Sequence, residues 1–310
     1  MEIYSKESDW GLEMNEELYK HMTQEEFLFR SSAVEKAFRD NDIESAIAIV
    51  TEMAQKNPFL FKYYRPRQHS IQALLDSEIY MCRPSTYDDS GDNEYLPDIN
   101  SIVRYYAEEV RGTPVSSLLF DDSFFESMIE QINANPKFIH YKTRIQDDFL
   151  TACITENFDE KMWTDYAQSG EGFCAVYGTN QLIVESHKLG YFFYPVRYVE
   201  SRKACEDIHF TADEYKDSEQ SYLSYNRKAY LSCLTKEILP YSSEKEWRLM
   251  IRNPGGFDGE KGKSYPFIKP FMIIAGENIG KNPEIEKSLI DASKQLGIEL
   301  IKASDYKNSR

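Results

Sequence analysis

The spacing of apolar residues divides the chain into a helical beginning and a mixed remainder. Between about residues 15 and 57, apolar positions recur with the period of amphipathic helices. Thr23 and Glu26 form a capping-box pattern at the start of one predicted helix, and a second amphipathic stretch follows Asn41. We therefore expect residues 1–57 to form an N-terminal helical cap, organised as a helical hairpin.

After residue 57 the pattern changes to short apolar runs that are typical of β-strands. These runs alternate irregularly with helical segments, so we predict an α+β domain over residues 58–310 and not a doubly wound sheet. Helical spacing between about residues 99 and 149 predicts a helical insertion within this domain. The main predicted strands cover residues 59–65, 79–83, 151–155, 172–177, 191–198, 244–252 and 267–275.

Composition supports a globular protein and argues against one class of partner. The chain has 310 residues, of which 41% are hydrophobic and 28% charged, and it is long enough to bury a sizeable core. Its formal net charge is −16. A protein that gains affinity by neutralising phosphates needs a basic surface, so we do not expect general nucleic-acid binding.

The cysteines and the distribution of apolar residues predict a cytoplasmic protein. The five cysteines form no C-x-x-C pair, and most lie in apolar runs, where cysteine behaves as a small hydrophobic residue. No run of 18 apolar residues occurs, and the first twenty residues lack the apolar core of a signal peptide. We therefore expect neither a membrane span nor secretion.

The first candidate site is the strand that ends in Lys62, Tyr63, Tyr64 and Arg65. A cation alternates with aromatic residues there, and the terminal guanidinium suits bidentate recognition of a phosphate or carboxylate. The alternative is an edge strand whose charged side chains face water.

The second candidate is an acidic loop with Asp88, Asp89, Asp92 and Glu94. Its spacing resembles a calcium-binding loop but lacks the terminal bidentate glutamate. We favour a solvated acidic turn and predict no metal site.

The third candidate is the strand Glu244 to Arg248. On a regular strand Glu244, Glu246 and Arg248 share one face, and Trp247 lies on the other. A carboxylate in a cleft can stabilise an oxocarbenium-like centre, as glycosyl transfer requires. The alternative is a ladder between Glu246 and Arg248 that only fixes the sheet.

An aromatic connection between two predicted strands is the fourth candidate. Trp163 and Tyr166 lie on one short helical turn and could form the floor of a pocket, or they could simply fill the core. Other catalytic plans are excluded, because the chain contains no H-E-x-x-H, G-x-S-x-G, P-loop or G-x-G-x-x-G motif.

Together these motifs resemble a bacterial family known as domain of unknown function 2971, over roughly residues 59–301. The family pattern has a K-Y-R strand, an "eIy-s-P" strand, an N-D-P-F-D loop, an M-W-x-x-Y-A stretch followed by G-F, and a Y-E-K-E-W-R strand. Four of these motifs correspond here to Lys62–Arg65, Glu78–Pro84, Met162–Phe173 and Glu244–Arg248. The N-D-P-F-D loop departs from the pattern, because it has become Asp88–Asp92, which keeps acids and loses the Pro-Phe pair.

The order of these elements is more remotely similar to the ADP-ribosyltransferase fold, a split mixed sheet that binds NAD in a cleft. This resemblance implies that NAD is the substrate and that Arg65 holds its phosphates or ribose. Trp163 or Tyr166 would stack on nicotinamide. Glu246 would bind the ribose 2′-hydroxyl in the transition state, and Glu244 would be the second acid. Tyr64 and Arg248 complete the NAD-binding set that we predict.

We therefore expect ADP-ribosyl transfer from NAD to an unknown protein or nucleic-acid acceptor, or NAD hydrolysis, by a toxin or phage-defence effector. One alternative is a non-enzymatic module that recognises a protein or nucleotide. Another is a metal-dependent nuclease that uses Asp88, Asp89, Asp92 and Glu246. A closed pocket containing Arg65, Tyr166 and Glu246 would favour the first, scattered positions the second, and carboxylates within about 5 Å of each other the third.

Overall fold

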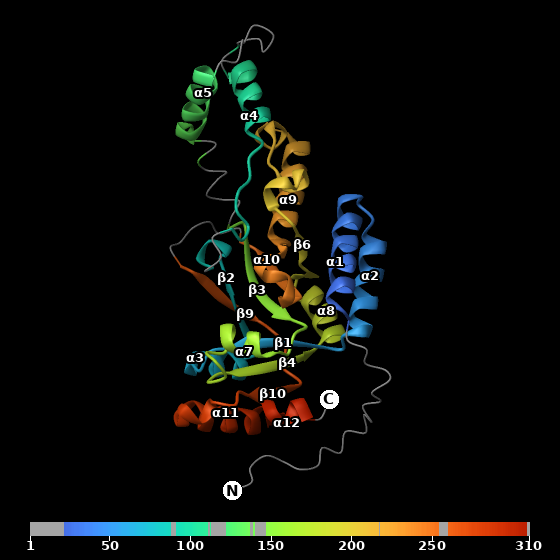
Figure 1. Cartoon of the computed structure of the whole chain (residues 1–310), viewed down its shortest axis with the longest axis vertical. Helices are drawn as coiled ribbons and strands as arrows, with labels where there is room; N and C mark the ends of the chain where they lie inside the picture. Colours follow the sequence, from blue (N-terminus) through green and yellow to red (C-terminus); the bar gives the residue numbers. More distant parts are fainter. Residues whose placement is uncertain are drawn as a thin grey trace.

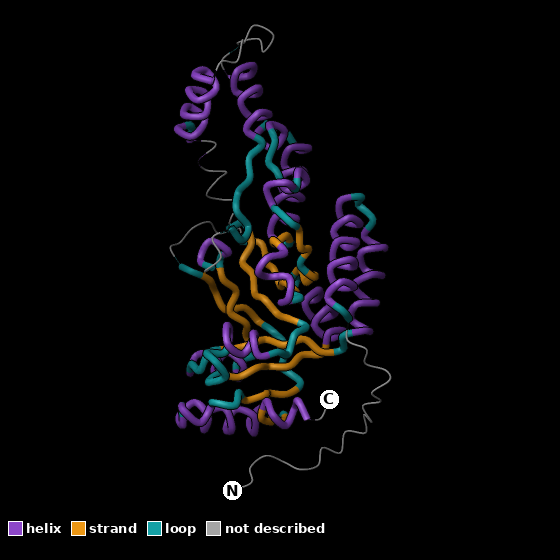
Figure 2. Tube along the Cα trace, in the orientation of Figure 1, coloured by secondary structure: helices purple, strands orange, loops and turns teal. Residues whose placement is uncertain are grey.

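The computed structural model describes residues 22–87, 91–110, 112, 122–136, 139, 147–216, 218–253 and 260–308. Within these residues the centre of the molecule is a nine-stranded sheet, with helices around it and at the ends of the molecule (Figure 1, Figure 2). Strands β10 and β11 are parallel and the other pairs antiparallel, so the expected α+β class with a mixed sheet is confirmed. The strands are β1 Phe59–Tyr64, β2 Glu78–Cys82, β3 Phe149–Thr155, β4 Phe173–Gly178, β5 Phe192–Pro195, β8 Glu246–Arg252, β9 Gly262–Pro266, β10 Met272–Ala275 and β11 Glu299–Lys302.

Strand β3 is where the sheet divides. Along one edge it pairs with β8 over its full length, from Phe149 opposite Arg252 to Thr155 opposite Glu246. Its other edge pairs with β1 at Thr155 and with β2 at Thr151. Because β1 continues to β4, β10 and β11 while β2 continues to β9, two wings of the sheet diverge from β3.

Lys62 connects the strands at this fork. Its Nζ donates a hydrogen bond of 2.9 Å to the backbone carbonyl of Cys153, which lies midway between the two positions where β3 meets β1 and β2. Lys62 thereby ties β1 to β3 beyond the single residue pair that the two strands share. The basic side chain of the K-Y-Y-R strand is thus used inside the fold.

The N-terminal segment forms the expected pair of helices, α1 Gln24–Arg39 and α2 Ile43–Lys56. Thr23 begins α1 as predicted, because its hydroxyl accepts a hydrogen bond of 3.1 Å from the backbone N–H of Glu26. Residues 1–21, which contain the rest of the expected cap, lie outside the described residues.

This hairpin packs directly on the central body. Phe27 of α1 and Val50 of α2 are buried in the same hydrophobic cluster as Trp247 of β8. At the end of α2, the side-chain amide of Asn57 donates a hydrogen bond of 2.6 Å to the carboxylate of Glu156, just after β3. The hairpin is therefore a layer of the same core.

An arm of helices extends from one end of the molecule (Figure 1). It contains α4 Ile99–Tyr105, which continues into the π-helix η2 Tyr106–Val110, and α5 Asp122–Ala134. Ile102 and Met128 belong to a small hydrophobic cluster of its own. These helices lie within the sequence range where we expected a helical insertion.

The remaining elements cover the sheet and connect its strands. The short strands β6 Arg197–Val199 and β7 Thr235–Glu237 form a separate parallel pair. Among the described residues, no helix is both long enough and apolar enough to cross a membrane. The other helices are α3 Gln68–Leu75, α7 Glu160–Tyr166, α8 Thr179–Lys188, α9 Glu219–Cys233, α10 Ile238–Tyr241, α11 Pro283–Leu296 and α12 Ala303–Asn308, with short helical turns η1 Pro84–Thr86, η4 Arg202–Ala204, η5 Glu206–Ile208, η6 Ala212–Tyr215, η7 Ser242–Glu244 and η8 Ile279–Lys281.

Candidate functional site

Arg248 is the centre of a buried set of charged side chains. Its guanidinium is fully buried, and Nε lies 2.8 Å from Oε1 of Glu246. The two terminal nitrogens donate to the two carboxylate oxygens of Asp92 at 2.8 and 2.9 Å, and one of them also donates to the carbonyl of Cys233 at 2.6 Å. Such a bidentate arrangement fixes both the position and the plane of the guanidinium.

Lys236 of β7 extends this set toward the surface. Its Nζ lies 3.1 Å from Oε2 of Glu244 and 3.3 Å from Oε2 of Glu246, and 4.1 Å from the centre of the Tyr241 ring. The hydroxyl of Tyr166 donates a hydrogen bond of 2.6 Å to Oε1 of Glu244.

Six residues thus form a continuous series, which we name the charge chain. It begins in the core and ends at Tyr166, which is 39% exposed. Its members, in order of contact, are Asp92, Arg248, Glu246, Lys236, Glu244 and Tyr166.

The backbone turn at Lys245 places Glu244 and Glu246 where both carboxylates contact Lys236. Lys245 has φ 45° and ψ 54°, a left-handed conformation that is uncommon for a residue other than glycine. Strand β8 begins only after it, so our expectation that Glu244 and Glu246 share one face of a regular strand is wrong. The side-chain hydroxyl of Thr155 donates to the carbonyl of Glu244 and holds this turn in place.

Burial and neighbouring charges determine the protonation of Glu246, Lys236 and Tyr166. Burial raises the pKa of Glu246, but the charges of Arg248 and Lys236 outweigh burial and lower the pKa to about 2. Burial lowers the pKa of Lys236, and the two neighbouring glutamates more than reverse this, so its pKa is raised. Burial and the Glu244 carboxylate both raise the pKa of Tyr166. At neutral pH the chain therefore holds an anion at Glu246, a cation at Lys236 and a neutral phenol at Tyr166.

Of the predicted catalytic and binding residues, Glu246 and Arg248 lie deepest. Glu246 is 3% exposed, and each of its carboxylate oxygens contacts a cation. The contact between Glu246 and Arg248 is the one that our structural alternative predicted. Strand β1 with Lys62 does not lie beside β8, because β3 separates them.

Trp163 does not have the open ring face that stacking on nicotinamide requires. The residue is 6% exposed, and its ring makes edge contacts with Tyr63 at 5.1 Å and with Phe158 at 5.7 Å between ring centres. The reason is that α7 lays its apolar side on β1, so Trp163 fills the core between them. Tyr166, one turn further along α7, is partly exposed as expected.

Arg65 follows the last residue of β1 and is exposed. Its guanidinium makes no hydrogen bond or ion pair with any residue that the structure describes. Tyr64 is half-buried and stacks on Phe173, with ring centres 5.0 Å apart. The carbonyl of Tyr64 lies against Gly172, where a Cβ atom would come within 2.0 Å of it. Because Gly172 donates to the carbonyl of Ala167, Arg65 emerges beside the turn that follows α7.

The acidic loop is solvated at Glu94, which is exposed, but it is not the solvated turn that we favoured at Asp92. Asp92 is 2% exposed and binds Arg248 with both oxygens. A buried carboxylate needs such a partner, because burying an unpaired charge is costly. Asp88 and Asp89 lie outside the described residues.

No metal site is formed by the part of the chain that the structure describes, since no group of three or more His, Cys, Asp or Glu side chains could hold an ion there. The two described acids of the nuclease alternative, Asp92 and Glu246, converge on the Arg248 guanidinium instead.

Sequence reasoning missed Lys236 and the pairing of Asp92. Lys236 lies in a strand of three residues, and nothing in its local sequence distinguishes it from a surface lysine. Asp92 is 156 positions from Arg248. The only available signal was that Asp92 and Arg248 both belong to motifs of the family that the sequence resembles.

The fold and site define an α+β protein with a charge chain that runs from its core to Tyr166. Residues 162–249 match the sequence model of the family DUF2971, whose description is a protein of unknown function. The matched segment contains every member of the charge chain except Asp92. Searches of the curated proteins and of the solved structures found no match.

Proposed function

We propose that this protein transfers ADP-ribose from NAD to an acceptor or to water, and that Glu244 is the carboxylate that meets the substrate. The observation that carries the proposal is the position of Glu244 in the charge chain. One of its oxygens is held by Lys236, and the other accepts a hydrogen bond from the partly exposed Tyr166. A role as a cytoplasmic toxin or phage-defence effector belongs to the same proposal and rests on the ADP-ribosyltransferase resemblance.

Glu244 suits this role better than Glu246. Glu244 is 4% exposed, so a ribose hydroxyl reaches its Oε1 where the Tyr166 side chain moves aside and gives up its hydrogen bond, and the carboxylate then lies next to the sugar. As the bond between nicotinamide and ribose breaks, nicotinamide leaves with the electron pair and positive charge develops on the ribose ring. A fixed anion stabilises that charge without having to reorganise. The oxygen of water or of the acceptor then forms the new bond to the ribose carbon and releases its proton to solvent.

Glu246 becomes a positioning residue in this mechanism. Its two oxygens bind Arg248 and Lys236, so it holds the ammonium that holds Glu244. Asp92 and Arg248 act one and two contacts further away. In this mechanism only Glu244 contacts the substrate, whereas the sequence predicted that Glu246 and Glu244 are both catalytic.

Parts of the predicted NAD-binding set fit the substrate and parts do not. Arg65 offers an exposed guanidinium with no described partner, which suits a diphosphate. Tyr166 offers an exposed ring beside Glu244. Trp163 and Arg248 are enclosed and do not fit a direct contact with NAD.

Release of nicotinamide from NAD tests the proposal. Glu244→Gln keeps the shape of the side chain and removes its charge, so turnover should fall about a hundredfold, which corresponds to about 3 kcal/mol. Arg65→Gln should act mainly by raising KM. Glu185→Gln removes the acid of a more exposed ion pair with Lys188 and is the matched control, with no expected change.

Two results would contradict the proposal. One is the absence of nicotinamide release by the folded wild-type protein. The other is wild-type turnover per folded molecule in Glu244→Gln, measured on protein whose thermal unfolding shows that it is folded. Either result would favour the non-enzymatic recognition module.

A specific observation supports that recognition module as the second candidate. A cavity of about 440 Å³ lies in the helical arm, at residues that include Asp98 and Lys216, and it contains no member of the charge chain. A binding site there would not require chemistry at Glu244.

A further inference from the structure

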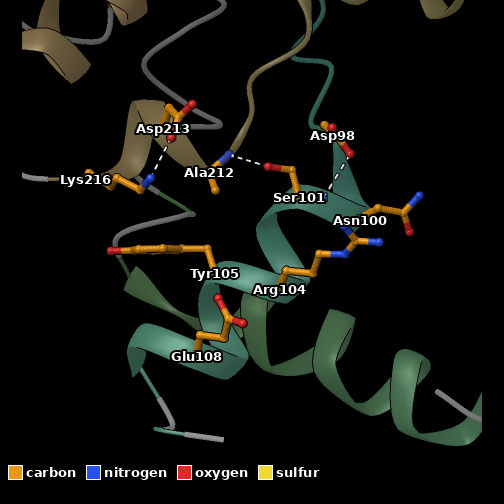
Figure 3. A pocket seen from close by; sticks show the side chains of 9 residues that line it. All are labelled: Asp98, Asn100, Ser101, Arg104, Tyr105, Glu108, Ala212, Asp213 and Lys216. Carbon is orange, nitrogen blue, oxygen red and sulfur yellow. Dashed lines mark hydrogen bonds and ion pairs between the residues drawn. The ribbon is translucent and has the colours of Figure 1, made fainter. Parts of the chain in front are cut away.

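The cavity of the helical arm lies between α4, the beginning of the π-helix η2, and the turn η6 (Figure 3). Its volume of about 440 Å³ falls in the range of small-ligand sites. A π-helix is rare and is often found at functional sites. The cavity is lined by Asp98, Asn100, Ser101, Arg104, Tyr105, Glu108, Ala212, Asp213 and Lys216.

Two opposite charges on the cavity wall do not pair with each other. Arg104 and Glu108 have the i, i+4 spacing that normally forms a salt bridge on an α-helix. Neither side chain has a hydrogen bond or ion pair with any residue that the structure describes, and Figure 3 shows the two side chains pointing in different directions. The cause is the change from α-helix to π-helix at Tyr106, which alters the rotation per residue between them.

The other charged groups of the wall are already used. Asp98 accepts a hydrogen bond of 3.1 Å from the backbone N–H of Ser101 and caps α4. Lys216 lies 2.6 Å from Asp213. Arg104 is therefore the cation, and Glu108 the carboxylate, that remain available to a ligand.

The cavity also offers a ring and selects against polyanions. Tyr105 is half-buried and lies on the wall beside Lys216 and Glu108 (Figure 3). Its ring can cover an apolar part of a ligand. The wall carries the three acids Asp98, Glu108 and Asp213 against two cations, so a ligand with several negative charges would be repelled.

We propose that this cavity binds a small zwitterionic ligand of dipeptide size, with one free ammonium group and one free carboxylate. Glu108 receives the ammonium, and Arg104 binds the carboxylate with its planar fork. Tyr105 packs against the side chain of the ligand. This inference does not rest on the use of NAD, because no residue of the charge chain takes part.

Titration calorimetry on the full chain with alanyl-tyrosine tests the inference. The unblocked dipeptide should bind, and either N-acetylation or C-amidation should weaken binding at least about tenfold, since each removes one charge pair. Glu108→Gln should bind the N-acetylated and the unblocked dipeptide about equally. Arg104→Gln should do the same for the amidated and the unblocked dipeptide.

The matched control is Glu130→Gln, which removes an exposed carboxylate from α5 in the same arm and does not line the cavity. This variant should keep the wild-type discrimination. The inference is overturned if no dipeptide binds up to about 10 mM, a concentration that would detect even millimolar affinity. It is also overturned if blocked and unblocked dipeptides bind the wild type alike, or if both glutamine variants keep full discrimination. Nicotinamide release by Glu108→Gln should equal that of the wild type, which separates this site from the proposed NAD chemistry.

Discussion

Replacing Arg248 with methionine removes the cation on which the inner half of the charge chain depends. Counted formally, the chain contains three acids, Asp92, Glu246 and Glu244, and two bases, Arg248 and Lys236. The substitution leaves three acids and one ammonium in a region that is almost entirely buried. Asp92 loses the only ion-pair partner that the structure gives it among the described residues.

The expected cost follows from what is left unpaired. Removing one partner of a buried ion pair costs about 3–5 kcal/mol, and methionine roughly preserves the volume, so we expect Arg248→Met to lose that much stability. Asp92→Asn keeps an oxygen that accepts a hydrogen bond, and it leaves the chain with equal numbers of acids and bases. Its cost should be about 2–3 kcal/mol, the value of the lost charge-assisted bonds. Glu185→Gln should cost less than about 1 kcal/mol, because its ion pair with Lys188 is largely exposed.

Urea unfolding at pH 7 measures these differences as changes in the free energy of unfolding. The double variant Asp92→Asn/Arg248→Met is the decisive measurement. Asparagine at position 92 removes the buried unpaired carboxylate, so the double variant should be more stable than Arg248→Met by at least about 1 kcal/mol. Losses that simply add in the double variant would show that Asp92 and Arg248 are not energetically coupled, and would refute the charge chain.

Two further predictions concern other parts of the molecule. Burial raises the pKa of Glu35 from its usual 4.5 to about 7 despite the nearby Arg197, so the folded protein keeps a proton that the unfolded chain loses between these pH values. Stability should therefore fall as pH rises from about 4.5 to 7. Glu35→Gln should make this fall smaller in melting temperatures measured from pH 4.5 to 8, and Glu156, whose pKa burial raises to about 8, should account for the rest. An equal fall in the variant would exclude Glu35 as a source. Gly172→Ala should cost about 1–3 kcal/mol in urea unfolding, because its Cβ would lie 2.0 Å from the carbonyl of Tyr64. Gly178→Ala, whose Cβ would have no contact nearer than 3.7 Å, should be much milder, and equal losses in the two variants would contradict the steric reason.

Local periodicity was sufficient to predict much of the fold. The capping pattern at Thr23 gave the start of α1, and the alternation after Lys245 gave β8. Both are decided by neighbouring residues, which the sequence displays directly. The expected strand over residues 191–198 is divided into β5 and β6, because the chain leaves β8 after Pro195 and pairs with β7. That division depends on a partner distant in sequence.

The candidate site was harder to predict, because its contacts join distant segments. The sequence suggested Glu246 with Arg248, two residues apart on one strand. It could not show that Asp92 binds the guanidinium of Arg248, or that Lys236 contacts two glutamates. For Trp163 the sequence allowed either a pocket or the core, and the packing of α7 on β1 decided for the core.

The composition of the charge chain indicates which of its ends can act on a ligand. A set of buried charges is a poor way to gain stability, since apolar side chains of similar volume often stabilise a core as well or better. The inner end is closed, because Asp92, Arg248 and Glu246 satisfy one another. Glu244 is held less tightly, because its Oε1 accepts a hydrogen bond from the neutral Tyr166 hydroxyl and lies 4.0 Å from Lys161, whose ammonium is also paired with Asp165. A ligand that brings positive charge close to Oε1 of Glu244 would gain a stronger contact than Lys161 makes there, and a sugar ring that becomes cationic in the transition state is such a ligand.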